Sequence, residues 1–223
     1  MYRLIAFDIY SATLDIYGSA IPAVEKVLGV PRETAEQFFD LWRTKQWYYL
    51  LLKNSMRDGY KSYYDITRDL LGYVEKVRGM ALTEDQREQL MDIWTSFRAW
   101  PESKEILEII RRKGYPIAML SNGDGCMLRP LEKSSGISFD YIFSGDMAKS
   151  YKPAKEIYQL PFDKLGIGKE ELLHVAGSMF DVMGAKAAGI HVAWINRRKE
   201  VLLDGSYKPD YEFQDLSGLL RIL

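Results

Sequence analysis

The chain has 223 residues, of which 47% are hydrophobic, and its 30 basic and 31 acidic side chains give a formal net charge of −1. A chain of this length can bury a sizeable core, as one large domain or as a core with an insert. Because charges of both signs are mixed along it, we expect neither a nucleic acid nor an anionic membrane surface as partner. The short basic runs at 111–113 and 197–199 are interpreted as solvated faces.

A single cysteine, Cys126, excludes an intrachain disulfide and fits a reducing compartment. We interpret it as a small packing residue, because His174 and His191, which could activate a thiol, lie in apolar runs typical of buried strands. The N-terminal apolar run is too short for a signal peptide, and no run approaches the roughly 20 apolar residues that span a bilayer. We therefore expect a cytoplasmic protein without contact to membranes.

The first predicted element is a strand at Leu4–Phe7, which ends directly before Asp8. A short, continuous apolar run of this kind is typical of a strand that is buried on both faces of a parallel sheet.

Residues 17–97 show no strand pattern. Apolar residues recur at helical spacing through 23–28, 34–51, 60–77 and 83–97, and Trp100-Pro101 then marks the return to another kind of structure, since proline restricts the residue before it. We therefore expect an all-helical cap domain of residues 17–97, inserted after the first strand, and a core domain of residues 1–16 and 98–223.

The second half of the chain alternates between strand and helix patterns. Apolar runs at 117–120, 141–143, 173–176 and 192–195 predict strands, and the stretches 103–113, 154–165 and 180–188 have helical spacing. Alternation of this kind builds βαβ units. The predicted fold class is therefore α/β, with a Rossmann-like, mostly parallel sheet and a helical cap.

Polar residues follow several of the predicted strands. In an open parallel sheet, ligands bind outside the carboxyl ends of the strands, near the point where the strand order reverses. The residues expected to converge there are Asp8, Ser121-Asn122-Gly123, Lys152, Ser178 and Asp181.

These motifs, in this order and spacing, resemble the L-2-haloacid dehalogenase (type II) branch of the haloacid dehalogenase superfamily over nearly the whole chain. The segments that carry the resemblance are Phe7-Asp8-Ile9-Tyr10, Trp42-Arg43-Thr44-Lys45-Gln46, Leu120-Ser121-Asn122-Gly123, Tyr151-Lys152-Pro153, Ile157-Tyr158, Phe180-Asp181 with Gly184-Ala185, and Trp194-Ile195-Asn196-Arg197.

The resemblance implies that Asp8 is a nucleophile and that Lys152 lies against it. A nucleophilic carboxylate has to stay ionised, and a nearby cation opposes the cost of its desolvation. Taken alone, Asp8 could equally cap a loop or helix, and Lys152 could be a surface lysine.

For substrate binding, the resemblance implies that Arg43 reaches over the cleft from the cap and helps the halide to leave, assisted by Asn122. A guanidinium suits either a halide or a substrate carboxylate. Ser121 and the amides around it could bind a carboxylate, although Ser, Asn and Gly also favour an ordinary strand-to-helix turn. Arg43 could otherwise lie on the surface.

Further site residues follow from the same resemblance. Asp181 is expected to act on the hydrolytic water, as its base or by orienting it. Tyr158 is expected to bring its hydroxyl into the site, or else to be a core aromatic. The expected apolar walls are Tyr10, Phe180 and Trp47, the last of which could also be core.

Metal-dependent phosphatases of the superfamily carry a second aspartate where this chain has Tyr10, and an acid that helps to bind Mg²⁺ where it has Gly177. Mg²⁺ requires oxygen ligands. We therefore expect no metal and no other cofactor.

Two motifs depart from the family pattern. Ser11-Ala12 replaces a Gly-Thr pair, so that a hydroxyl near the nucleophile is missing; Ser11 or Thr13 could supply it, although strand alternation argues against equivalence. Ala176-Gly177-Ser178 replaces Ser-Ser-Asn, and thus Ser178 takes the place of an asparagine that positions water. These departures affect ester hydrolysis first.

The predicted function is hydrolytic dehalogenation of a short L-2-haloacid to a 2-hydroxy acid through an ester on Asp8. The alternatives are a hydrolase of another small substrate on the same scaffold, including a weak phosphatase, and a non-catalytic protein that binds a small acid. The resemblance also implies a homodimer formed through the helical insert, and the run Trp47-Tyr48-Tyr49 could serve that contact or the core.

Overall fold

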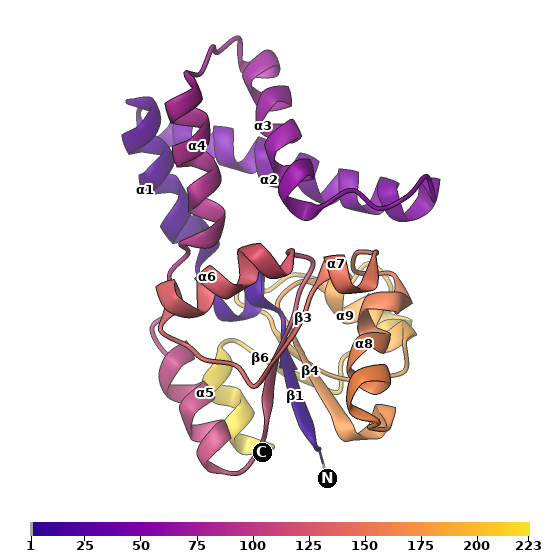
Figure 1. Cartoon of the computed structure of the whole chain (residues 1–223). Helices are drawn as coiled ribbons and strands as arrows, with labels where there is room; N and C mark the ends of the chain where they lie inside the picture. The colour runs from indigo at the N-terminus through magenta and orange to yellow at the C-terminus, as the bar shows by residue number, and fades with distance from the viewer. Residues whose placement is uncertain (1) are drawn as a thin grey trace.

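The computed structural model describes residues 2–223 and contains a six-stranded parallel sheet in the order β3-β2-β1-β4-β5-β6 (Figure 1). All neighbouring strands are parallel. The strands are β1 (Leu4–Phe7), β2 (Ile117–Leu120), β3 (Tyr141–Phe143), β4 (Leu172–Ala176), β5 (His191–Ile195) and β6 (Tyr211–Phe213). The predicted α/β class is confirmed, whereas β6 was not predicted because its run is short and contains Glu212.

Side chains of each strand alternate between two apolar layers. Ile5 and Phe7 of β1 belong to one buried cluster, which also contains residues of α5 and α6, whereas Leu4 and Ala6 face a second cluster with residues of α8 and α9. The sheet is therefore covered on both faces, as its continuous apolar strands predicted. The helices of this part are α5 (Ser103–Arg112), α6 (Gly125–Ser135), α7 (Gly145–Ala148), α8 (Lys155–Leu165) and α9 (Met179–Ala187).

Short helical turns occur at Ile9–Thr13, Ile93–Thr95, Lys169–Glu171, Gly205–Tyr207 and Leu216–Arg221. The first of these, η1 (Ile9–Thr13), is a single turn of π-helix directly after β1.

Four helices lie together beyond one end of the sheet (Figure 1): α1 (Ile16–Leu28), α2 (Arg32–Met56), α3 (Tyr63–Arg78) and α4 (Glu84–Asp92). Side chains that accept backbone N–H bonds begin three of them, namely Asp15 for α1, Ser62 for α3 and Thr83 for α4. Gly29 and Gly79 end α1 and α3 in the left-handed region, with φ of 63° and 62°, which glycine adopts without steric cost.

The two connections between these helices and the sheet run side by side. Leu14 forms an isolated antiparallel bridge with Ala99, and the N–H group of Asp15 donates to the carbonyl of Arg98 at 2.9 Å. These contacts lie close to the boundaries expected for a cap at 17–97, although the division into two domains stays a prediction.

One interpretation of individual residues was wrong, and a second holds only in part. Cys126 is exposed, because it lies in the first turn of α6 and points away from the sheet-facing residues Met127 and Leu128. The run 197–199 lies in the loop after β5 rather than on a helix; Arg198 and Lys199 are exposed, as expected, and both arginines of the run line a pocket.

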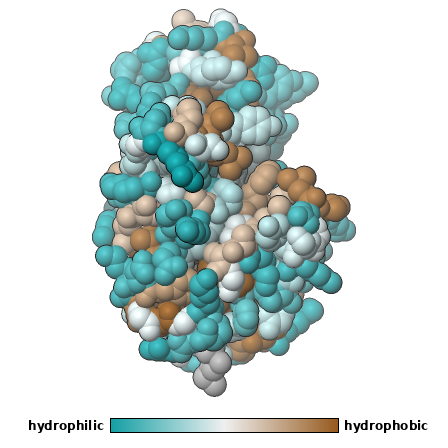
Figure 2. Space-filling model, turned by 90° about the vertical axis from the view of Figure 1, so that its right-hand side faces the viewer, coloured by the Kyte–Doolittle hydropathy of each residue, from teal (hydrophilic) through white to brown (hydrophobic). Residues whose placement is uncertain are grey.

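The surface turned toward the viewer in Figure 2 is mostly hydrophilic, with hydrophobic residues in small groups. Between residues 2 and 223, no helix combines the length and the hydropathy that crossing a bilayer would need.

Candidate active site

Asp8 follows β1, which lies between β2 and β4 in the sheet, where the chain leaves β1 in one direction and later returns on its other side. Such a reversal of strand order opens a crevice at the carboxyl ends of the strands. Asp8 is 8% exposed and stands at this crevice. The sequence-based placement of the candidate nucleophile agrees with the structure.

The turn η1 donates hydrogen bonds to the carboxylate of Asp8. Asp8 caps this turn: its Oδ2 accepts the N–H group of Ser11 at 3.0 Å and also the hydroxyl of Ser11. Thr13 instead donates its hydroxyl to the main-chain carbonyl of Asp8 at 2.8 Å. Of the two candidates for the missing family hydroxyl, only Ser11 therefore reaches the carboxylate. Strand alternation was the wrong guide, because the chain turns after Asp8 instead of continuing extended.

Gly177 allows η1 to approach the end of β4. A Cβ atom at this position would lie 2.3 Å from the nitrogen of Ala12 and 2.5 Å from the hydroxyl oxygen of Ser11. The departures in the first and fourth motifs are thus in contact, and the absence of a side chain at 177 leaves room for the Ser11 hydroxyl.

Lys152 lies between two carboxylates. Its Nζ is 3.1 Å from Oδ1 of Asp8 and 2.8 Å from Oδ2 of Asp181, and the lysine is 1% exposed. Burial alone would lower the pKa of Lys152, but Asp181 and Asp8 together hold it above its ordinary value. Lys152 is therefore a fixed cation beside Asp8, not a surface lysine.

Asp181 is 1% exposed and accepts three side-chain donors. Besides Lys152, Tyr158 donates to its Oδ1 at 2.7 Å, and His174 Nε2 lies 2.8 Å from its Oδ2. Burial alone would raise the pKa of Asp181, but His174 and Lys152 hold it well below its ordinary value. Asp181 is thus a firmly ionised acceptor.

His174 was missed as a site residue. Its apolar neighbours correctly indicated a buried strand, and only the alternation of β4 could have signalled that its ring faces α9 and Asp181. His191, by contrast, is half-buried at the start of β5 and bonds to Tyr2 at 3.1 Å.

The two predicted residues after β2 differ in their placement. Asn122 lines the inner end of the site, and its Oδ1 accepts the N–H group of Lys152 at 2.6 Å. Ser121 is fully buried, and its hydroxyl accepts the N–H group of Gly123 at 3.3 Å, so the structure places it behind the site. Tyr158 likewise touches Asp181 rather than a pocket.

Arg43 reaches the site from α2 of the helical layer and is 8% exposed. Its Nη1 donates to Gln46 at 2.5 Å and to the hydroxyl of Tyr63 at 3.0 Å. The guanidinium also lies 5.6 Å from the ring centre of Trp47 and 5.7 Å from that of Trp94. Because all of these partners are uncharged, the positive charge of Arg43 is available to an anion.

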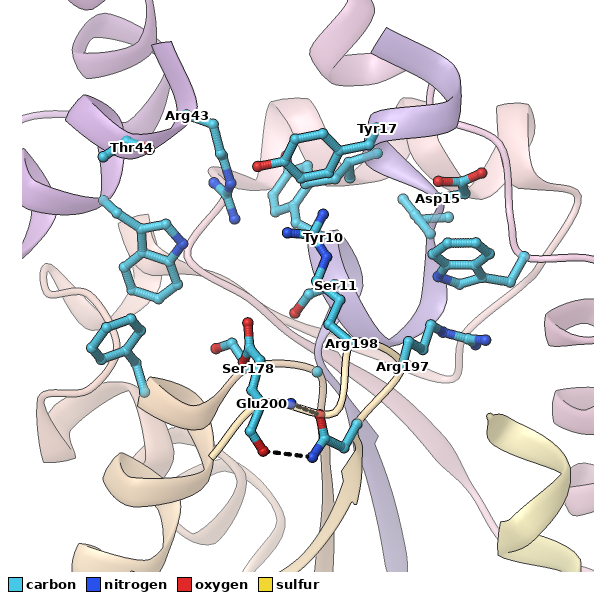
Figure 3. A pocket seen from close by; sticks show the side chains of 17 residues that line it. Tyr10, Ser11, Asp15, Tyr17, Arg43, Thr44, Ser178, Arg197, Arg198 and Glu200 are labelled. Atoms are coloured by element: carbon cyan, nitrogen blue, oxygen red, sulfur yellow. Dashed lines mark hydrogen bonds between the residues drawn. The ribbon is translucent and has the colours of Figure 1, made fainter. Parts of the chain in front are cut away.

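Two adjoining pockets lie between the helical layer and the sheet. The inner one, of about 10 Å³, contains Asp8, Asn122, Lys152 and Asp181 in its lining, and the outer one measures about 380 Å³ (Figure 3). Both are lined by Tyr10, Ser11, Arg43, Trp47 and Ser178.

Aromatic rings form the walls, as expected. Tyr10 stacks on Tyr63 with ring centres 5.5 Å apart, and Trp47 packs against Phe180 at 5.6 Å. Trp47 is therefore a wall of the pocket. The hydroxyl of Tyr10 is buried, and burial raises its pKa well above the ordinary value, so the group stays neutral.

The space between the carboxylates of Asp8 and Asp181 suits the ammonium group of Lys152 better than a metal ion, because this lysine already bridges the two. Across residues 2–223, no group of three or more His, Cys, Asp or Glu side chains has the arrangement of a metal site.

A parallel sheet with a carboxylate at its reversal point, a bridging lysine and an arginine contributed from a helical layer define a class of hydrolases. A model of the haloacid dehalogenase-like hydrolases matches residues 2–189, and the chain belongs to this family.

Similar proteins narrow the family to one branch and confirm the resemblance to the L-2-haloacid dehalogenases. An (S)-2-haloacid dehalogenase of Pseudomonas sp. (strain YL) is 29% identical, with 98% of this chain and 93% of the relative covered. Haloacetate dehalogenase H-2 of Moraxella sp. (strain B) is also 29% identical, with 98% and 96% covered. The structure of the L-2-haloacid dehalogenase of Xanthobacter autotrophicus with chloropropionic acid covalently bound superposes with a TM-score of 0.87, at 26% identity and coverage of 100% and 98%.

Proposed function

We propose that this protein hydrolyses short L-2-haloacids to 2-hydroxy acids, without a metal ion, through an ester on Asp8. The observation that carries the proposal is the contact of Asp8 with Lys152 at the floor of a pocket whose opposite side presents Arg43. The names of the relatives support the same substrate class.

In the first step, an oxygen of Asp8 forms a bond to the halogen-bearing carbon, and the carbon–halogen bond breaks with inversion. Oδ2 is held by Ser11 and Oδ1 by Lys152, which fixes the plane of the carboxylate. The halide leaves toward Arg43 and the amide of Asn122, whose positive charge and N–H dipoles stabilise the developing anion.

In the second step, water attacks the carbonyl carbon of the Asp8 ester and the bond to the alkoxide oxygen breaks. One proton of the water goes to that oxygen, which gives the 2-hydroxy acid, and the other is released to solvent as the Asp8 carboxylate forms again. Three donors already occupy the oxygens of Asp181, and its lowered pKa makes it a weak base. Its proposed role is therefore to orient Lys152 and the water-binding side of the site, where Ser178 contributes its hydroxyl.

The test is halide release from L-2-chloropropionate, measured with and without EDTA. We expect release by the unmodified protein in both conditions and none by Asp8→Asn. Metal-dependent phosphate release from p-nitrophenyl phosphate, without halide release, would establish the phosphatase alternative instead.

Single turnover in ¹⁸O-labelled water with enzyme in excess tests the ester itself. Label in Asp8 supports the intermediate, whereas label in the product alone indicates direct attack by water. Intact mass after incubation with substrate separates slow hydrolysis, which leaves an adduct on Asp8, from a non-catalytic binding protein, which leaves an unchanged mass and no product.

We also propose a cytoplasmic location and a homodimer formed through the helical layer. Along α2, Tyr48, Leu52 and Met56 recur at helical spacing and are 55%, 53% and 49% exposed. An apolar stripe of this kind fits contact with a second copy. Light scattering tests it: Leu52→Glu should convert a dimer into a monomer.

A further inference from the structure

The outer pocket is larger than a chloropropionate molecule requires. Its volume is about 380 Å³, whereas one water molecule needs only ~10–15 Å³ of the same kind of volume. The carbon under attack has to lie at Asp8, in the inner pocket of about 10 Å³. A methyl side chain leaves most of the outer pocket unfilled, which points to a larger substrate.

Arg198 is a cation in this outer pocket that no other contact explains. Its guanidinium lies 4.3 Å from the ring centre of Tyr17, and no carboxylate among residues 2–223 comes within 4.0 Å of it. Figure 3 shows Arg43 and Arg198 extending into the pocket from the helical layer and from the loop after β5. Stacking on an aromatic ring leaves the N–H edge of a guanidinium free for an anion.

The guanidinium of the neighbouring Arg197 already has partners in the protein. It forms an ion pair with Glu102 and lies 4.4 Å from the ring centre of Trp100. Of these adjacent arginines, Arg198 is therefore the one available to a ligand.

Two carboxylates also line the outer pocket. Asp15 caps α1 through the N–H group of Gly18 at 2.9 Å, and Figure 3 shows it on the far side of the pocket from Arg43. Glu200 holds Asn196 through main-chain contacts, and its negative charge opposes a bound anion. An anion near Arg198 is thus bound against the negative charges of both Asp15 and Glu200.

We propose that Arg198 binds a second carboxylate of the substrate, so that the preferred substrates are 2-halo dicarboxylic acids. This inference rests on the proposed function. The first carboxylate and the halogen occupy the inner end near Arg43 and Asn122, and the remainder of the substrate crosses the outer pocket to Arg198. A planar guanidinium binds a carboxylate through two parallel hydrogen bonds, which gives orientation as well as affinity.

The kinetic test compares kcat/KM for L-2-chlorosuccinate, L-2-chloropropionate and 2-chloro-3-phenylpropionate. We expect chlorosuccinate to be preferred, and Arg198→Gln to lower its kcat/KM about ten- to a hundredfold, the effect of one charged hydrogen-bonded contact. Chloropropionate should change less than about twofold. Lys199→Gln is the matched control, since Lys199 is exposed and lines neither pocket, and Glu200→Gln should raise the preference for chlorosuccinate.

Equal effects of Arg198→Gln on all substrates, or a preference for the phenyl compound, would overturn the inference. Calorimetry with succinate and propionate gives a reading that does not depend on turnover. If no substrate releases halide, but succinate binds more tightly than propionate and loses this advantage in Arg198→Gln, the dehalogenase proposal fails while the dicarboxylate site stands. Succinate binding that is unaffected by Arg198→Gln rejects the site.

Discussion

At the scale of single residues, the site depends on one buried ammonium group shared by two buried carboxylates. Lys152 approaches Asp8 and Asp181 at 3.1 and 2.8 Å. Removing either carboxylate leaves the buried ammonium with a single partner, and removing the lysine leaves both carboxylates without their shared cation. The lysine therefore fixes both the attacking carboxylate and the acceptor beside it.

Asp181→Asn should lower the free energy of unfolding by about 3 kcal/mol at neutral pH, because Lys152 then loses a buried partner. Because the pKa of Asp181 is lowered in the folded state, its stabilisation is complete above its ordinary value near 3.8 and is lost as the pH falls through the lowered value. Denaturant unfolding of both proteins should thus show a difference that shrinks as the pH falls below about 4. A difference that stays constant as the pH is lowered well below about 4 would contradict the assignment.

Ser11→Ala removes the hydroxyl that bonds to Asp8 but keeps the N–H bond at 3.0 Å. We expect kcat for halide release to fall about ten- to a hundredfold, since one hydrogen bond to a charged group is lost. Thr13→Val is the control, because the hydroxyl of Thr13 donates to the main-chain carbonyl of Asp8 and to no atom of the carboxylate. Stopped-flow measurement of both variants separates the roles, and similar losses in kcat would refute a special role of Ser11.

At the scale of elements, the turn η1 and the end of β4 form one packed unit. Gly177→Ala places a Cβ atom 2.3 Å from the backbone of Ala12, and backbone atoms cannot move aside without shifting the turn that holds Asp8. We expect a loss of about 2 kcal/mol in the free energy of unfolding together with loss of halide release. Gly72→Ala is the control: open space surrounds that position in α3, and alanine there should stabilise by about 0.5–1 kcal/mol. Thermal and denaturant unfolding measure both.

Elements with strong periodicity could be predicted from the sequence. The five predicted apolar strands and the helices predicted at 103–113, 154–165 and 180–188 appeared as expected, because burial on both faces and helical amphipathicity leave direct traces in residue order. The helical layer appeared for the same reason, from Ile16 to Asp92. The helices α6 and α7 were not predicted.

Two residues missed by the prediction share a physical cause, which is contact between residues distant in sequence, whereas a third was left open for a local reason. His174 and Arg198 are functional candidates only because folding brings them to Asp181 and to Tyr17. Ser11 was left open because the turn that follows β1 is a π-helix, which residue order did not indicate. The contact between Asp8 and Lys152, which the family motifs implied, is present in the structure.

At the scale of the whole molecule, polar contacts join the helical layer to the sheet part around the pockets. Asn54 at the end of α2 donates to the carbonyl of Tyr151 at 2.6 Å and accepts its N–H group at 3.1 Å. Asp124, which precedes α6, accepts the hydroxyl of Tyr60 at 2.6 Å and the N–H group of Tyr64 at 2.8 Å. These contacts hold Arg43 over Asp8.

Asn54→Ala should weaken the contact between the helical layer and the sheet part, because it removes both hydrogen bonds to Tyr151. We expect the loss to cost about 1–3 kcal/mol of that contact. We expect a higher KM and faster hydrogen exchange at the end of α2, measured by mass spectrometry. Asn54→Asp provides a graded comparison, since it keeps an acceptor for the N–H group of Tyr151 and loses the donor. Exchange that is equal in all three proteins would show that Asn54 does not hold the layers together.

The position of η1 links chemistry to movement of the helical layer. The turn is capped by Asp8 and ends at Thr13, whose carbonyl accepts the N–H group of Trp100 at 3.2 Å and the hydroxyl of Ser103 at 2.8 Å, so both connections between the helical layer and the sheet are anchored to it. A rotation of the helices would therefore pull directly on the residues that grip the attacking oxygen. We therefore expect that a foreign helical layer, exchanged for this one, would have to preserve this turn to preserve the surroundings of Asp8.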